Sequence, residues 1–161
     1  MWLPFFRIMA IIIKPPTPLT FDKTIKSIFL AGSIEMGMAE NWQSTLEKEL
    51  EDYKVIILNP RRDSWDSSWQ QSINNPLFCE QVEWELNAQE QADIIAMYFA
   101  PKTKAPITLL ELGLFAASKK LLVCCPEGFW RKGNVDIVCH KYNIPMCQTL
   151  SDLLSKIKTL L

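Results

Sequence analysis

Short apolar runs alternate along this chain with segments whose apolar residues recur at helical spacing. The runs predict buried strands and the spaced segments predict helices. We expect strands at 27–32, 55–59, 93–99, 121–125 and 144–148, and helices at 38–50, 76–90, 108–118, 135–142 and 151–161. Strand runs that are apolar on both faces are typical of a parallel sheet covered by helices on both sides. The pattern therefore predicts a doubly wound α/β fold with a mainly parallel five-stranded sheet.

The first thirteen residues are almost wholly apolar and precede the segment Lys14–Pro18. A membrane span needs about 20 apolar residues, so this run is too short, and Arg7 divides it. A signal peptide would place its basic residue before the apolar region and small residues at a cleavage site, and neither feature is present. We expect residues 1–18 to form an N-terminal arm, as a short strand or a subunit contact, and residues 19–161 to form one domain.

Composition narrows the range of partners. The chain has 161 residues and a formal net charge of −1, with no basic block that would bind nucleic acid, so a small-molecule partner is favoured. Its five cysteines include no C-x-x-C motif, which indicates reduced core thiols in a cytoplasmic protein. His140 beside Cys139 does not make a metal site, and we expect no metal and no cofactor.

In a doubly wound fold, ligands bind beyond the carboxyl ends of the strands. After the first strand, the segment from Gly32 to Gly37 is able to present backbone N–H groups to an anion or a sugar hydroxyl. It matches neither a Walker A loop nor a dinucleotide fingerprint, because the required lysine and glycines are missing. Gly32 and Gly37 have the alternative interpretation of simple turn glycines.

The segment 59–75 follows the second predicted strand and has neither a helical nor a strand period. Loops this long in compact domains are usually functional lids or disordered segments. As a lid, it would stack Trp65 or Trp69 on a nucleobase and direct Arg61 or Arg62 to a phosphate or carboxylate. As a plain surface loop, it would be pinned by tryptophan on the core and by arginine–aspartate pairs.

Two acidic positions are candidates for chemistry. Glu111 is the only charge between Lys104 and Lys119. With Thr108 it matches a capping box, in which the glutamate bonds back to the start of the helix. Alternatively, a carboxylate in the first helical turn is held ionised by the helix dipole and desolvated by leucines, which suits a nucleophile at an anomeric carbon. A second carboxyl would then assist the leaving group. The second acidic position is Glu85, which shares a face of the preceding predicted helix with Gln89.

Four segments together resemble the nucleoside 2-deoxyribosyltransferase family: 28–34, 59–63, 92–96 and 110–116, of which Glu111-Leu-Gly after Ala92-Asp-Ile is the most specific. The resemblance covers about residues 26–140. It implies a flavodoxin-like (Rossmann-like) fold and dimers or higher homo-oligomers. Members cleave the N-glycosidic bond of 2′-deoxynucleosides through a covalent deoxyribosyl-glutamate and transfer the sugar to another base. Related members hydrolyse deoxynucleoside monophosphates.

The resemblance also implies roles for single residues. The nucleophile falls on Glu111, the second catalytic carboxylate on Glu85, and an asparagine donated by a neighbouring subunit on Asn134. Asp93 matches a structural aspartate. The remaining candidates are substrate-binding residues at the sugar and the base, namely Gly32, Ser33, Asn59, Arg61, Arg62, Asp63 and Trp65.

Two departures from the family pattern leave the substrate open. Ala105 stands where transferases carry an aspartate, and a leucine-rich helix replaces the tyrosine-bearing C-terminus of some members. Two alternatives therefore accompany deoxyribosyl transfer. One is a hydrolase of (deoxy)nucleoside 5′-monophosphates that uses Arg61 or Arg62 for the phosphate, and the other is a non-catalytic module that binds a nucleotide derivative.

Overall fold

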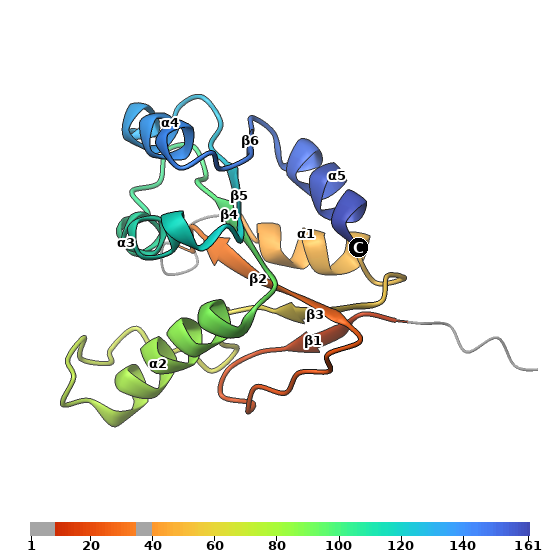
Figure 1. Cartoon of the computed structure of the whole chain (residues 1–161). Coiled ribbons are helices and arrows are strands. Elements are labelled where there is room, and N and C mark those ends of the chain that lie inside the picture. The colour runs from red at the N-terminus through yellow and green to blue at the C-terminus, as the bar shows by residue number, and fades with distance from the viewer. Residues whose placement is uncertain (1–8, 35–39) are drawn as a thin grey trace, which may run out of the picture.

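The computed structural model describes residues 9–34 and 40–161 and is shown in Figure 1. In these residues, six parallel strands form one sheet in the order β1-β3-β2-β4-β5-β6. The strands are β1 (Ile11–Ile13), β2 (Lys26–Gly32), β3 (Val55–Leu58), β4 (Ile94–Tyr98), β5 (Leu121–Cys124) and β6 (Met146–Cys147). The helices are α1 (Trp42–Glu49), α2 (Pro76–Gln91), α3 (Pro106–Phe115), α4 (Lys132–Lys141) and α5 (Leu150–Leu160).

The predicted doubly wound fold is confirmed, with one strand more than expected. The additional strand β1 lies at the sheet edge beside β3, with Ile12 opposite Ile57. Its last residue, Ile13, is buried, whereas Ile11 and Ile12 are about half exposed, as befits an edge strand. Part of the apolar N-terminal segment is thus a strand, and residues 1–8 of the predicted arm lie outside the described residues.

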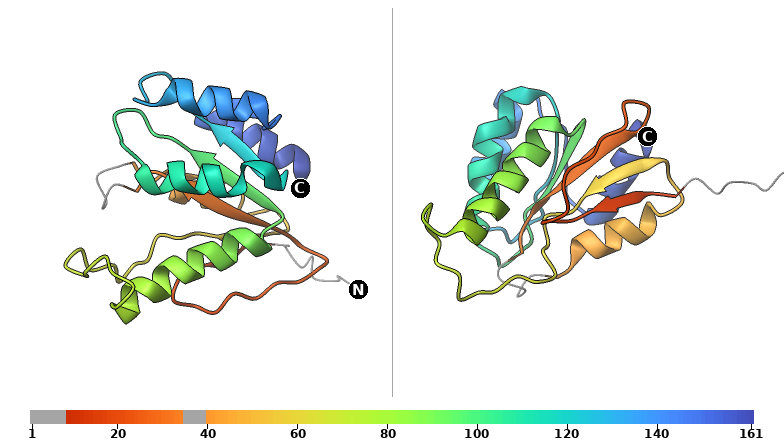
Figure 2. Two further views of the ribbon diagram at one scale, coloured as in Figure 1. Left: turned by 60° about the vertical axis from the view of Figure 1, so that its left-hand side comes forward. Right: turned by 90° about the horizontal axis from the view of Figure 1, so that it is seen from below.

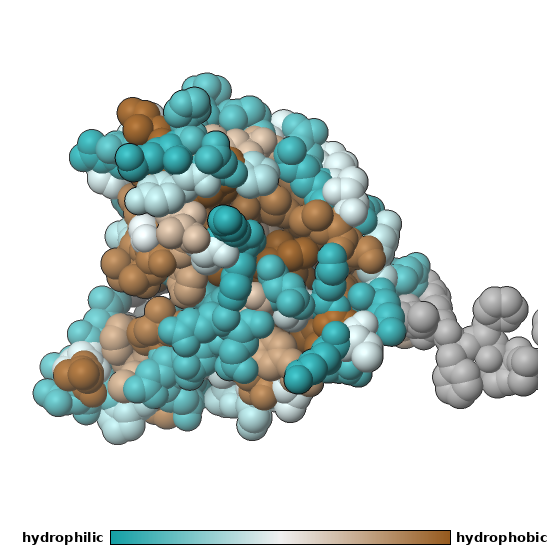
Figure 3. Space-filling view, viewed as in Figure 1, coloured by the Kyte–Doolittle hydropathy of each residue, from teal (hydrophilic) through white to brown (hydrophobic). Residues whose placement is uncertain are grey.

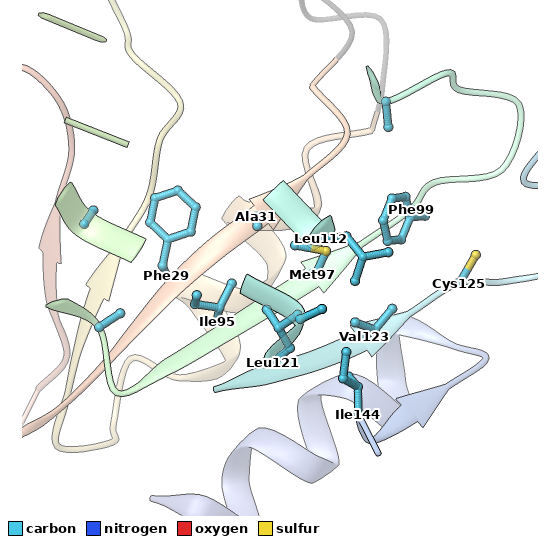
Figure 4. Close-up of a cluster of buried hydrophobic side chains, with 14 of the residues drawn as sticks. Phe29, Ala31, Ile95, Met97, Phe99, Leu112, Leu121, Val123, Cys125 and Ile144 are labelled. Atoms are coloured by element: carbon cyan, nitrogen blue, oxygen red, sulfur yellow. The ribbon is translucent and has the colours of Figure 1, made fainter. Parts of the chain in front are cut away.

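The helices cover both faces of the sheet, as Figure 2 shows. On one face, α2, α3 and α4 pack on side chains such as Phe29, Met97 and Val123, and Figure 4 shows Leu112 of α3 in this cluster. On the other face, Trp42 of α1 and Leu153 of α5 belong to the second cluster. Strand residues with alternating side-chain directions supply both clusters, which explains why the strands are apolar throughout.

Several element boundaries differ from the prediction for local reasons. The first helix begins at Trp42, because the Asn41 side chain accepts a hydrogen bond from the Ser44 N–H at 3.1 Å and caps it. Helix α3 begins two residues early, at Pro106, a residue suited to the first helical position, and α3 continues into a short 3-10 helix at Ala116–Ser118. Helix α4 begins three residues early, and the predicted strand 144–148 reduces to the two residues of β6.

All five cysteines are free thiols, four of them buried and Cys79 partly exposed on α2. None of the helices in the described ranges has the length and apolarity required to cross a membrane.

Candidate active site

The chain reverses its direction of travel across the sheet between β2 and β4, where doubly wound folds bind their ligands. Figure 3 shows the surface hollowed in this region, between α3 and the segment that leads into α2. At the end of β2, a Cβ on Gly32 would lie 2.5 Å from the Tyr98 carbonyl oxygen and 2.6 Å from the Trp42 ring. Glycine is therefore required at position 32 by close packing.

Ser33 and Thr103 join the ends of β2 and β4. The Ser33 Oγ lies 2.8 Å from the Thr103 Oγ1 and accepts a hydrogen bond from the Ala100 N–H at 3.1 Å. The Ser33 side chain is fully buried in this network, so it fixes the two loops in place. The second predicted glycine of this loop, Gly37, lies outside the described residues.

Glu111 lies in the second turn of α3, because the residue preceding this helix is Ala105. The capping-box interpretation is therefore wrong, and so is the expectation that the helix dipole holds this carboxylate ionised in a first turn. The side chain is 7% exposed, on the same buried stripe as Thr108 and Leu112. Burial, and secondly the charge of Glu85, raises the pKa of Glu111 to about 8, against an opposing hydrogen bond from the Gln89 side chain.

Glu85 lies on α2 and acts electrostatically on Glu111, so the structure brings the two predicted carboxyls together. Burial raises the pKa of Glu85 to about 7, while a hydrogen bond from Gln81 favours its ionised form. The Gln81 Nε2 donates to the Glu85 Oε1 at 2.7 Å. Two adjacent, desolvated carboxyls that titrate near neutral pH are typical of acid–base chemistry.

Glu85 is supported by Gln81 and Gln89, one helical turn before it and one after it. Besides its bond to Glu85, the Gln81 Nε2 donates to the Pro60 carbonyl oxygen at 3.0 Å, and the Gln89 Nε2 donates to the Glu85 carbonyl oxygen at 3.2 Å. Gln89 was expected on the helix face of Glu85, whereas Gln81 was not among the predicted site residues. The i−4 spacing from Glu85 is the signal that identifies it.

Asn59 and Arg61 anchor the start of the 59–75 loop on α1. The Asn59 Nδ2 donates to the Glu47 Oε1 at 2.6 Å, and the Arg61 Nε donates to the Gln43 Oε1 at 2.9 Å. A further hydrogen bond runs from an Arg61 guanidinium nitrogen to the Glu40 carbonyl oxygen at 3.2 Å. Partial burial lowers the pKa of Arg61. The residues that support Asn59 and Arg61, namely Glu40, Gln43 and Glu47, were not predicted from the sequence.

The rest of the 59–75 loop has no helix or strand, as predicted, and projects beyond the sheet at the lower left of Figure 1. Arg62 pairs with Glu80 at 2.8 Å and stacks over the Trp69 ring at 5.0 Å. Trp69 in turn meets Trp65 edge to face, with ring centroids 5.0 Å apart. The tryptophans thus contact each other, and the arginine pairs with a glutamate where the surface-loop interpretation expected an aspartate.

The remaining candidates lie at the periphery. Asp63 is exposed and pairs with Lys14 at 3.3 Å, and Asn134 is exposed in the first turn of α4. Ala105, which stands where the family carries an aspartate, is buried in a left-handed conformation with φ 44° and ψ 53°. Non-glycine residues adopt this conformation at an energetic cost, and such strain concentrates at functional sites. Asp93 accepts hydrogen bonds from the Ser27 N–H and hydroxyl at 2.8 and 3.1 Å.

Comparisons with known proteins agree with this architecture. The chain is similar in structure to a conserved protein from Enterococcus faecalis V583, with a TM-score of 0.58 and 13% sequence identity over 85% of this chain and 99% of the other. That likeness supports the fold alone. A search of curated protein sequences finds no match. The family model described as "nucleoside 2-deoxyribosyltransferase like" matches residues 25–129, and the chain therefore belongs to this family.

Proposed function

We propose that this protein cleaves the N-glycosidic bond of a (deoxy)nucleoside and transfers the 2-deoxyribosyl group to another base through a covalent glycosyl-Glu111 intermediate. The observation that carries the proposal is the pair of buried Glu111 and partly buried Glu85, whose pKa values are raised to about 8 and about 7. Membership of the deoxyribosyltransferase-like family supports the class of reaction.

The proposed reaction has two balanced steps. Between the two pKa values the carboxyl pair shares one proton, and the reactive form is the one in which Glu85 holds it. In the first step, the ionised Glu111 oxygen of this form bonds to the anomeric carbon while the bond to the base nitrogen breaks. The electron pair of that bond leaves with the base, which takes the proton of Glu85. In the second, a nitrogen of the acceptor base attacks the same carbon, the Glu111 carboxylate departs, and Glu85 recovers a proton from the acceptor. Water in place of the acceptor base would give hydrolysis.

The arrangement of the arginines favours an unphosphorylated substrate over a nucleoside 5′-monophosphate. Arg61 is engaged by Gln43 and by the Glu40 carbonyl, and Arg62 is paired with Glu80. A phosphate would have to compete with these partners for either guanidinium. We propose that both arginines hold the 59–75 loop, whose exposed Trp65 is placed to cover a base.

We further propose that the protein acts as a homo-oligomer. Helix α3 carries Ile107, Leu110 and Leu114 on its outer side, each more than half exposed, next to the turn that bears Glu111. Large apolar side chains gathered on one helix face commonly mark a protein contact. A Leu110→Lys, Leu114→Lys variant should lower the molar mass in solution measured by light scattering, whereas an unchanged mass would exclude this face.

Base exchange tests the proposed function. The protein is incubated with 2′-deoxynucleosides and a free acceptor base, and product nucleosides are separated by chromatography. Glu111→Gln should abolish exchange and the sugar adduct seen by intact mass, and Glu85→Gln should slow it by about 10²–10⁴-fold. Glu90→Gln, an exposed change on the same helix as Glu85, is the control and should be fully active. Turnover in Glu111→Gln equal to that of the wild type would refute the mechanism.

The same assay separates the alternatives. Base release without exchange indicates a hydrolase, and activity confined to 5′-monophosphates indicates a nucleotide substrate. Saturable binding without any product, with affinity retained in Glu111→Ala, indicates a binding module.

A further inference from the structure

Two glutamine side chains occupy buried positions on α2 that a packing helix would usually fill with apolar residues. Gln81 is 4% exposed and Gln89 is fully buried, and they lie one turn before and one turn after Glu85. Met or Leu at either position would fill a similar volume without burying a polar group.

The amide nitrogens of these glutamines fix the direction in which each side chain points. The Gln81 Nε2 donates both to the Glu85 Oε1 at 2.7 Å and to the Pro60 carbonyl at 3.0 Å, which uses both of its hydrogens. The Gln89 Nε2 donates to the Glu85 backbone carbonyl at 3.2 Å, and the Gln89 side chain lies near enough to Glu111 to lower the pKa of that carboxyl. Each carboxyl of the pair is thus served by one amide.

This orientation leaves the other end of each amide unsatisfied. Among the described residues, the Oε1 atoms of Gln81 and Gln89 are buried and have no hydrogen-bond partner. A buried acceptor without a partner is unfavourable, and such atoms are rare in native proteins. Packing therefore does not explain the two amides, since an apolar residue would avoid this cost. Their amide nitrogens instead bond to the Glu85 carboxyl and backbone and to Pro60, while their own oxygens stay unpaired.

We propose that Gln81 and Gln89 are positioning residues for the carboxyl pair: Gln81 holds the Glu85 carboxyl through an amide N–H, and Gln89, which is bonded to the Glu85 backbone, lies beside Glu111 and favours its ionised form. This inference rests on the proposed function, in which the two carboxyls exchange protons during the reaction. Pro60 is itself fixed, because it lies between Asn59 and Arg61, which are anchored on α1. Gln81 therefore connects the Glu85 carboxyl to a backbone segment that is itself fixed on α1.

The groups that act on the pair come from the two helices that carry it. For Glu111 of α3 they are burial, the charge of Glu85 and the amide of Gln89, and for Glu85 of α2 they are burial and the amide of Gln81. Burial favours the neutral form of each carboxyl, and each amide favours the charged form. Without the amides, both carboxyls would stay protonated to higher pH, and the nucleophile would be ionised less often.

The test combines two near-isosteric variants with direct titration of the full-length protein. The titration of each carboxyl is followed by its ¹³C NMR signal. Gln81→Met should raise the pKa of Glu85 by about one to two pH units, and Gln89→Met should raise the pKa of Glu111 by a similar amount. Gln91→Met is the matched control, because Gln91 is exposed and makes a similar i−4 contact with the Asn87 carbonyl at 3.3 Å. It should leave both titrations unchanged. The kcat/KM profile is expected to shift to higher pH in both test variants, on its acidic side in Gln81→Met and on its alkaline side in Gln89→Met.

Titrations that are unchanged in both folded test variants would overturn the proposal. If a variant did not fold, the wild type decides: the side-chain amide NMR signals of Gln81 and Gln89 should move as the carboxyls titrate, and that of Gln91 should not. If the amide signals of Gln81 and Gln89 stay constant while the carboxyls titrate, the proposed contacts between these amides and the carboxyl pair are excluded. Because these measurements need no turnover, a lack of activity on every nucleoside would refute the proposed function alone.

Discussion

Replacing Glu111 by glutamine should stabilise the folded protein at alkaline pH while it removes the proposed nucleophile. The carboxyl is nearly inaccessible, and its pKa rises from 4.5 in an open environment to about 8 in the fold. Between these values, the folded state binds more protons than the unfolded state. Stability contributed by this group therefore falls as the pH rises from about 4.5 to about 8, and the full cost is present above pH 8.

The size of the effect follows from the same two values. Each pKa unit corresponds to about 1.4 kcal/mol, so the ionised Glu111 costs about 5 kcal/mol at pH 9. A glutamine of similar shape carries no charge and avoids this cost. With a urea dependence of about 2 kcal/mol per M, the unfolding midpoint should rise by about 2 M urea at pH 9 and should hardly change at pH 4.

Urea unfolding at pH 4 and pH 9, followed by tryptophan fluorescence, measures both midpoints. Glu90→Gln on the exposed side of α2 is the control and should shift the midpoint little at either pH. If the unfolding midpoint of Glu111→Gln at pH 9 equals that of the wild type within error, the Glu111 carboxyl is hydrated. The inference that it is a desolvated nucleophile would then be wrong.

Three further outcomes are expected. The kcat/KM of the wild type should be bell-shaped around pH 7.5, because the carboxyl pair titrates near 7 and 8, and a profile that is flat from pH 6 to 9 would contradict the assignment. Gly32→Ala should lower the free energy of unfolding by about 1–3 kcal/mol, since its methyl group would collide with the Tyr98 carbonyl, whereas Gly113→Ala on α3 meets no atom within 4 Å and should stabilise by up to about 1 kcal/mol; thermal melts compare the two. Deleting residues 1–13 should reduce the melting temperature, because the burial of Ile13 and the pairing of β1 with β3 are lost, and an unchanged melting temperature would mean that β1 contributes no stability.

The sheet and its helices were predictable because burial on both faces leaves a distinct mark on the sequence. The strand from Val55 to Leu58 is wholly apolar, and so is the strand that ends at Tyr98. The edge strand β1 was harder to assign, because this short apolar run fits both a strand and a subunit contact. Its residues pair with β3 residues 45 positions further along the chain, and this pairing leaves no local signal.

Only part of the site follows from the sequence. The partnership of Glu85 and Glu111 was predicted from the family resemblance, but the position of Glu111 within α3 was wrong. Thr108 and Glu111 fit a helix start in sequence spacing, whereas Pro106 determines the actual first turn. The contact of Gln81 with Pro60 depends on how the 59–75 loop leaves the sheet, and spacing along the chain does not encode it.

The three residues of β1 also bear on how copies of this protein meet. An open sheet edge is a template on which strands of other chains can add. Here the described edge strand is only three residues long, and it is followed by Lys14 and two prolines, which have no N–H to donate to an incoming strand. Extension of the sheet from one molecule to the next is thereby limited at this edge. We therefore expect the proposed homo-oligomer to form through helical surfaces, where side-chain packing would set its geometry.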